Sequence, residues 1–174
     1  MYLLTEFFYD LLLSYGDYTV KFIFLFLGKT QEKYLDTAIS DYASRLGRYL
    51  PLEIIVLKEK YNRNASDDVI KQSGAELLLG RCGKNSFKVA LDLSGSQHDS
   101  NELAHMVRNW QDRSLQTVYF LIGGHLGLHS SVVQEADVVW SLSRLTFTHE
   151  MTRMLVLEQL YRACTINAGQ NYHK

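Results

Sequence analysis

The residues best suited to chemistry lie in the last third of the sequence, after two short apolar runs. The first run, Thr117–Ile122, ends in Gly-Gly-His-Leu-Gly at 123–127, and the second, Val138–Trp140, leads into the hydroxyl-rich stretch Ser141–His149. Glycines at the carboxyl end of a strand let the backbone approach a ligand closely. The hydroxyl and backbone groups of the second stretch, together with Arg144, suit the flat polar edge of a nucleoside. We therefore expect a ligand pocket where these two loops meet.

The common glycine and metal motifs are not found here. The run 123–127 is not the G-x-G-x-x-G of dinucleotide sites, and the sequence has neither the GK[ST] of a P-loop nor the G-x-S-x-G of a serine hydrolase. Taken alone, this run favours a plain tight turn. His125 and His129 are four residues apart and could share a helix face, but no third ligand stands at a suitable spacing. We therefore predict no metal site.

Length and composition indicate a single globular domain. The chain has 174 residues, of which 47% are hydrophobic and 21% charged, with a net charge of −1. All 18 basic residues but only 16 of the 19 acids lie in 21–174, so this part carries +2. A small basic excess is compatible with an anionic partner but does not demand one.

The chain has the features of a cytoplasmic protein that does not enter the membrane. Cys82 and Cys164 form no CxxC pair, as expected of two reduced thiols. No apolar run approaches the roughly 18 residues of a transmembrane helix. Residues 1–20 contain no Lys or Arg, so they lack the basic start of a signal peptide.

Apolar runs alternate with amphipathic patterns along the rest of the chain. We predict strands at Lys21–Leu27, Leu52–Leu57, Phe87–Leu91, Thr117–Ile122 and Val138–Ser141. We predict helices at Gln31–Leu46, Ser66–Leu79, Ser100–Asp112 and Met151–Asn167, with Ser66 and Ser100 as N-caps, Asp92–Ser96 as a turn and Gly169 as the final stop.

This alternation is typical of an α/β fold with a parallel or mostly parallel sheet and crossover helices. We expect one domain over 21–174. Residues 1–20 form an N-terminal extension, either a loosely packed amphipathic helix or an upstream start that is not natural.

Several short motifs, each weak alone, occur together in order over residues 21–174 and match one known protein family. The matching residues are Gly28-Lys29, Glu32-Lys33-Tyr34, Tyr42, Arg45-Leu46-Gly47, Leu52–Ile55, Ala90–Asp92, Gly95, Ile122–Gly124, Gly127-Leu128, Ser141–Ser143, Thr146-Phe147, His149, Arg153, Glu158–Ala163 and Tyr172–Lys174. The chain resembles the SPOUT-class RNA methyltransferases, and within that class the RlmH (YbeA-like) family.

The resemblance implies a fold and an activity. The fold is a sheet flanked by helices with a C-terminal trefoil knot, in a homodimer that holds S-adenosylmethionine (SAM) in the knot. The activity is methylation of N3 of a pseudouridine in large-subunit (23S) rRNA, on assembled ribosomes. Carried over by position, the cofactor contacts are Leu91, Gly123, Leu142, Ser143, Arg144, Leu145, Thr146 and Phe147. Arg162, Tyr172, His173 and Lys174 match positions of the substrate site.

Elementary chemistry agrees with these roles. Methyl transfer from a sulfonium is an in-line displacement that depends on alignment. The substrate nitrogen must also lose a proton, and His173 is the candidate acceptor, with Tyr172 second. Arg162 and Lys174 could neutralise RNA phosphates, with help from Lys29, Lys33, Arg45 and Arg48.

Two departures from the family lie beside the expected cofactor loop. Thr148 stands where proline is usual, and Glu150 where glutamine is usual. Proline would stiffen the entry to the last helix, and Glu150 adds an acid. We expect both changes to affect cofactor affinity more than the reaction itself.

Two other functions remain open at this point. An NAD-dependent oxidoreductase could use the 123–127 loop, but it would need an acidic ribose contact after the first strand, and we find none. A factor that binds RNA or assists ribosome assembly could keep the same fold without catalysis.

Overall fold

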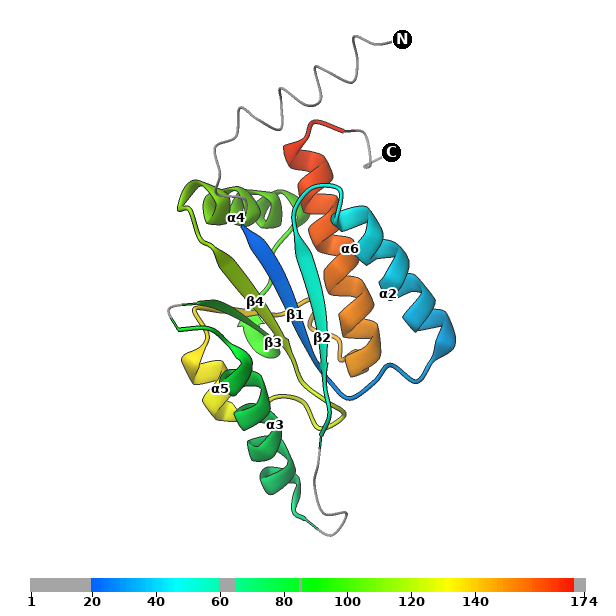
Figure 1. Cartoon of the computed structure of the whole chain (residues 1–174), viewed down its shortest axis with the longest axis vertical. Coiled ribbons are helices and arrows are strands. Elements are labelled where there is room, and N and C mark those ends of the chain that lie inside the picture. Colours follow the sequence, from blue (N-terminus) through cyan, green and yellow to red (C-terminus); the bar gives the residue numbers. More distant parts are fainter. Residues whose placement is uncertain (1–19, 60–64, 85, 171–174) are drawn as a thin grey trace.

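A computed structural model describes residues 20–59, 65–84 and 86–170 (Figure 1). The elements follow one another as β1 (Lys21–Leu27), α2 (Lys33–Leu46), β2 (Leu52–Leu57), α3 (Asp67–Arg81), β3 (Phe87–Ser96), α4 (Ser100–Asp112), β4 (Thr117–Ile122), α5 (Ser130–Glu135), β5 (Val138–Trp140) and α6 (His149–Asn167). The predicted N-terminal extension lies outside the described residues except for Val20, which is fully buried.

The strands form one sheet in the order β2-β1-β4-β3-β5, and every pairing between them is parallel. All strands therefore present their carboxyl ends at the same edge. The predicted fold class, a parallel α/β sheet flanked by helices, is confirmed. No helix of the described ranges is long and apolar enough to cross a bilayer.

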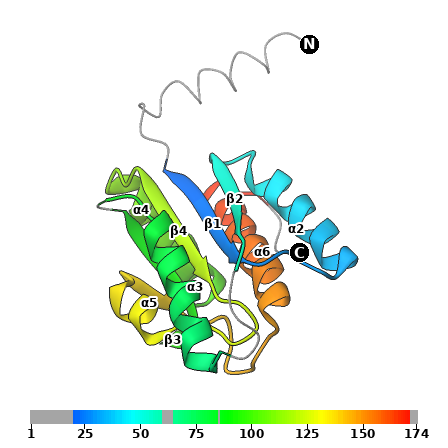
Figure 2. The ribbon, with the colours of Figure 1, turned by 60° about the horizontal axis from the view of Figure 1, so that its bottom comes forward.

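Helices cover both faces of the sheet, and Figure 2 shows α3 and α5 on the side away from α2 and α6. Alternate residues of β1 explain this division, because successive side chains of a strand point to opposite faces. Phe22, Phe24 and Phe26 pack with buried residues of α2, α4 and α6. Ile23 and Leu25 pack with residues of α3 and α5. A strand buried on both faces accounts for the unbroken apolar run in the sequence.

Most predicted boundaries are correct to within two residues. Ser66 caps α3 by accepting a hydrogen bond from the backbone N–H of Val69, and Gly169 follows α6 with a φ of 66°. The predicted cap Ser100 is wrong. Asp99 caps α4 instead and forms a capping box with Glu102, an arrangement that satisfies free N–H groups at both residues. The helix α5 was not predicted, because six residues are too few to show a period.

The predicted turn at Asp92–Ser96 is also wrong, because these residues continue β3. The strand pairs with β5 through both Leu91 and Ser96, which face the same residue, Trp140. The residues between them form a bulge. A β-carbon placed on Gly95 would lie 2.4 Å from the carbonyl oxygen of Val139. Only glycine allows the two backbones to come this close.

Replacing Gly95 tests this contact. The added methyl group of Gly95→Ala would meet backbone atoms that cannot rotate away, so we expect the free energy of unfolding to fall by about 1–3 kcal/mol. Urea denaturation measures the change. Gly80→Ala is the matched control, because a β-carbon at Gly80 meets nothing within 4 Å. Equal stability of Gly95→Ala and the parent protein would contradict the account.

Candidate active site

A cavity of about 650 Å³ opens at the carboxyl edge of the sheet. Its walls come from the ends of β3, β4 and β5, with one residue of α3 and two of α6. The lining residues are Lys71, Leu91–Leu93, Ile122–Leu128, Trp140–Ser143, Leu145–His149 and Thr152. This volume is within the usual range for small-molecule sites. The two loops that the sequence singles out therefore do meet around one cavity.

The glycine loop after β4 is both a tight turn and a cavity wall. The backbone N–H of Gly127 donates to the carbonyl of Gly124 at 3.0 Å, and Gly127 has a φ of 83°. A β-carbon on Gly123 would lie 2.5 Å from the carbonyl carbon of Gly127. Because no side chain fits inside the turn, the loop presents backbone to the cavity.

The loop after β5 is held by its own hydroxyl groups. The Ser141 hydroxyl is buried and donates to the carbonyl of Ser143 at 2.9 Å. The Ser143 hydroxyl accepts a hydrogen bond from the backbone N–H of Leu145 at 3.0 Å. Ser141 also donates its N–H to the carbonyl of Ser96 in the bulged part of β3. These bonds fix the loop without helical or strand structure.

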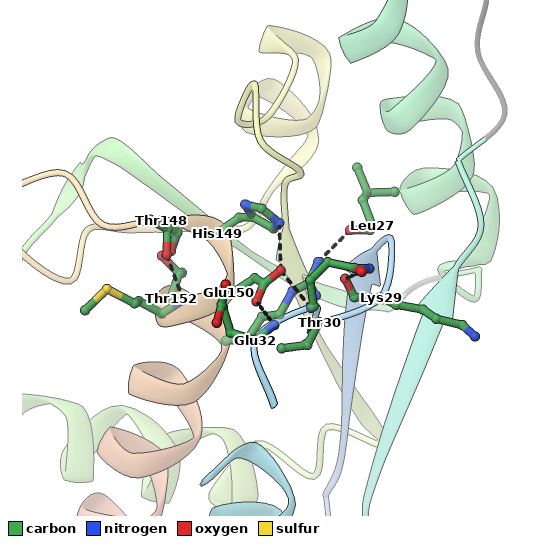
Figure 3. Close-up of polar contacts among 11 residues, drawn as sticks. Leu27, Lys29, Thr30, Glu32, Thr148, His149, Glu150 and Thr152 are labelled. Carbon is green, nitrogen blue, oxygen red and sulfur yellow. Dashed lines mark hydrogen bonds and ion pairs between the residues drawn. The ribbon is translucent and has the colours of Figure 1, made fainter. Parts of the chain in front are cut away.

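A buried acid and base fix the start of α6 to the connection between β1 and α2 (Figure 3). The Glu150 carboxylate accepts hydrogen bonds from the backbone N–H groups of Gln31 at 2.9 Å and Glu32 at 3.1 Å. These N–H groups belong to the N-cap residue Glu32 and to the residue before it, so the carboxylate lies at the start of α2, where an anion also meets the positive end of the helix dipole. This contact was not predictable from the sequence, because Glu150 and its two partners are over 110 residues apart.

Arg153 completes this clamp from the next turn of α6. Its guanidinium is fully buried and donates to the carbonyl of Leu27 and, at 3.0 Å, to the hydroxyl of Thr30. It also lies 4.8 Å from the ring centre of Phe26. Glu150 and Arg153 together hold Thr148, His149 and Thr152 against the cavity, so we call them the α6 clamp.

The clamp sets the charges beside the cavity. Burial would raise the pKa of Glu150, but the N–H groups of Gln31 and Glu32, with the nearby His149 and Arg153, lower it below its usual 4.5. Burial and Arg153 lower the pKa of His149 below 6.5, and Glu150 opposes them only in part. At pH 7 we therefore expect a carboxylate at Glu150 and a neutral imidazole at His149.

The structure brings most of the predicted cofactor residues together. Leu91, Gly123, Leu142, Ser143, Leu145, Thr146 and Phe147 all line the cavity. Arg144 does not line it, and its side chain is exposed. His125 belongs to the loop that the sequence predicted at the pocket, whereas Lys71 was not predicted. Glu150 and Arg153 were noted only as family positions, and the contacts of the α6 clamp were not predicted.

The predicted substrate residues are in a different place. Arg162 lies 13 residues beyond His149 on α6, or about 20 Å along the helix axis. Its guanidinium is 2.6 Å from the carboxylate of Glu158, and it does not line the cavity. Tyr172, His173 and Lys174 lie outside the described residues.

The two histidines do not share a helix face, contrary to the spacing argument. His125 lies in the glycine loop, whereas His129 caps α5 by accepting from the backbone N–H of Ser131. His129 also lies 3.8 Å from Asp68 of α3. Within the described parts of the chain, no three His, Cys, Asp or Glu side chains come together as metal ligands would.

The α6 clamp should stabilise the fold to a degree that depends on pH. A lowered folded-state pKa means that ionised Glu150 stabilises the fold above pH 4.5, and this contribution is lost as the pH falls through the folded value. We expect Glu150→Gln to lower the free energy of unfolding by about 1–2 kcal/mol at pH 7. The difference should shrink toward pH 3. Urea denaturation across this range measures it, with the exposed Glu76→Gln as control. Equal losses at pH 7 and pH 3 would exclude this role for the carboxylate.

Comparison with known proteins gives the family. A family model described as "Predicted SPOUT methyltransferase" matches residues 20–173. The ribosomal RNA large subunit methyltransferase H of Desulfotalea psychrophila is 42% identical over 150 residues, which cover 86% of this chain and 97% of that protein. The protein of the same name from Clostridium novyi is 41% identical, over 85% of this chain and 96% of that protein.

A solved structure adds a weaker likeness. The SpoU methyltransferase AviRb of Streptomyces viridochromogenes, in complex with the cofactor AdoMet, is 15% identical with a TM-score of 0.42, over 88% of this chain and 62% of that one. The family match and the two relatives span nearly all of residues 20–173, and they confirm the resemblance found in the sequence. The chain belongs to the SPOUT methyltransferase family and, within it, to the ribosomal RNA large subunit methyltransferase H (RlmH) group.

Proposed function

We propose that this protein transfers a methyl group from SAM to N3 of a pseudouridine in large-subunit (23S) rRNA, on assembled ribosomes in the cytoplasm. The observation that carries the proposal is the cavity at the carboxyl edge of the sheet. Seven of the eight residues that the family resemblance assigns to the cofactor line it. The relatives named as large-subunit rRNA methyltransferases support the choice of substrate.

The residues around the cavity fit a nucleoside cofactor. Leu91 and Leu142 provide apolar surface, and the glycine loop provides backbone with no side chain in the way. The 142–147 loop adds hydroxyl and backbone groups, as recognition of a purine edge and a ribose requires. When bound, SAM would supply a methyl group on a sulfonium.

The chemical work left to the protein is alignment and proton removal. The substrate nitrogen forms a bond to the methyl carbon as the carbon–sulfur bond breaks, and the sulfur keeps the electron pair. The proton of N3 must leave, and we assign its acceptance to His173, with Tyr172 and Arg162 on the substrate side. A general base of this kind contributes roughly 10²–10⁴-fold to a rate.

We further propose a homodimer and a knotted C-terminal region. Arg162 lies far along α6 from the cavity of its own chain, so a second copy could supply the substrate residues. Leu93 and Leu145 are 57% and 70% exposed at the cavity, and a partner or substrate would cover them. The knot is supported by the family membership.

Ligand-dependent melting tests the cofactor. At about 100 times their dissociation constants, SAM and S-adenosylhomocysteine should each raise the melting temperature by roughly 5–10 °C, whereas NADH should not. A shift with NADH alone would indicate an oxidoreductase and overturn the proposal. No shift with any of the three ligands would also count against it.

The substrate step has a separate test. A variant lacking Tyr172–Lys174 should keep its melting shift with S-adenosylhomocysteine but lose methyl transfer to ribosomes by at least about 100-fold. Mass spectrometry of rRNA nucleosides measures the N3-methylated product. Naked rRNA should be a much poorer substrate than ribosomes for the parent protein. Transfer at the parent rate without the tail, or equal rates on naked rRNA, would contradict these roles.

A further inference from the structure

Among the residues that the structure describes, one side chain with a fixed positive charge lines the cavity. Of its lining residues, Lys71 is the only lysine or arginine in the described ranges, and it reaches the site from α3. The other titratable groups of the wall are Asp92, His125 and His149. The walls contributed by the strand ends otherwise consist mostly of backbone, hydroxyl groups and apolar side chains.

Three carboxylates lie beside this part of the cavity, and none of them is paired with Lys71. The Glu59 carboxylate lies next to the glycine loop, 3.2 Å from the place of a β-carbon on Gly124. Asp92 accepts two hydrogen bonds from Ser94, one from its N–H at 2.9 Å and one from its hydroxyl at 2.7 Å. Asp68, on the first turn of α3, lies 3.8 Å from His129. No ion pair or hydrogen bond from the described residues reaches the Lys71 ammonium. A partly buried cation that no described residue pairs with suits an anionic group of a ligand.

The proposed cofactor carries one such group. Its nucleoside part is uncharged and fits the loops after β4 and β5. Its amino-acid part ends in a carboxylate, for which a lysine ammonium is a compact and flexible partner. An RNA phosphate is the other possible anion, but phosphate recognition uses several basic residues on an open surface. Here a single lysine lines a cavity of small-molecule size.

We propose that Lys71 binds the carboxylate of the methionine part of SAM and thereby distinguishes the intact cofactor from simpler adenosine thioethers. This inference rests on the proposed function. It assigns a specificity role to a residue outside the strand-end loops. Lys71 does not touch the reacting atoms in this arrangement. We therefore expect its replacement to change only the affinity for the amino-acid part of the cofactor.

Calorimetric titration with two ligands tests the proposal. S-adenosylhomocysteine has the carboxylate, and 5′-methylthioadenosine has the same nucleoside and thioether without the amino-acid group. Lys71→Met keeps the length and apolar stem of the side chain. It should lower the affinity for S-adenosylhomocysteine by about 10- to 100-fold. The affinity for 5′-methylthioadenosine should change by no more than about twofold, because this ligand has no carboxylate to lose a contact.

Two further variants control the experiment. Lys84→Met makes the same change at an exposed lysine beyond the other end of α3 and should leave both affinities unchanged. Lys71→Arg keeps the charge and should retain most of the affinity for S-adenosylhomocysteine. If Lys71→Met does not fold, as judged by circular dichroism, Lys71→Gln takes its place.

The outcomes separate this inference from the proposed function. If the parent protein binds neither ligand, the proposed function fails. If the parent protein binds both ligands but Lys71→Met lowers both affinities equally, or lowers neither, the proposed carboxylate contact is wrong and the methyltransferase proposal stands. If Lys71→Met binds S-adenosylhomocysteine as the parent does but transfers less methyl to ribosomes, the carboxylate contact is also wrong, and Lys71 would instead contact an RNA phosphate.

Discussion

Two places where backbones meet without room for a side chain determine the shape of this protein. At Gly95, β3 lies so close to β5 that a β-carbon would overlap the carbonyl of Val139, and at Gly123 the chain folds back against Gly127 in the same way. Both contacts lie where the parallel strands end. Since β3, β4 and β5 are neighbours in the sheet, the loops that follow them surround one cavity, and these two contacts shape its wall.

The α6 clamp gives this edge of the sheet its rigidity. Leaving a buried guanidinium or carboxylate without partners costs several kcal/mol, but here the charges of Glu150 and Arg153 are shared with backbone groups of the β1–α2 connection. The clamp therefore joins the start of the last helix to the end of the first strand. Thr148 and His149, which line the cavity, depend on the α6 clamp for their position.

Periodic features of the sequence predicted the sheet and the long helices well. The apolar run Phe22–Leu27 predicted a strand buried on both faces, and the structure confirms it. The extension of β3 past Leu91 was missed because Asp92–Ser96 has the composition of a turn, and only the approach of Val139 makes it a bulged strand. The cap of α4 was misplaced by one residue because Asp99 and Ser100 are both good caps.

The candidate site was predictable where it consists of continuous loops and not where it depends on distant contacts. The segments 123–127 and 142–147 stood out by composition, and all but Arg144 of the predicted cofactor residues line the cavity. Lys71 has no local signal in the sequence. Glu150 and Arg153 were noted as family positions, but their contacts were not predictable, because only the fold brings their partners near. Tyr172–Lys174 were assigned from the family, and that assignment stays a prediction.

The most direct test of the account is a crystal structure of the protein with S-adenosylhomocysteine. We predict the nucleoside between the Gly123–Gly127 turn and the Leu142–Phe147 loop, beside Leu91, hydrogen-bonded mainly to backbone groups. A nucleoside bound elsewhere on the protein, or a cavity that stays free of ligand at saturating concentration, would contradict the central claim that these strand ends form the cofactor site.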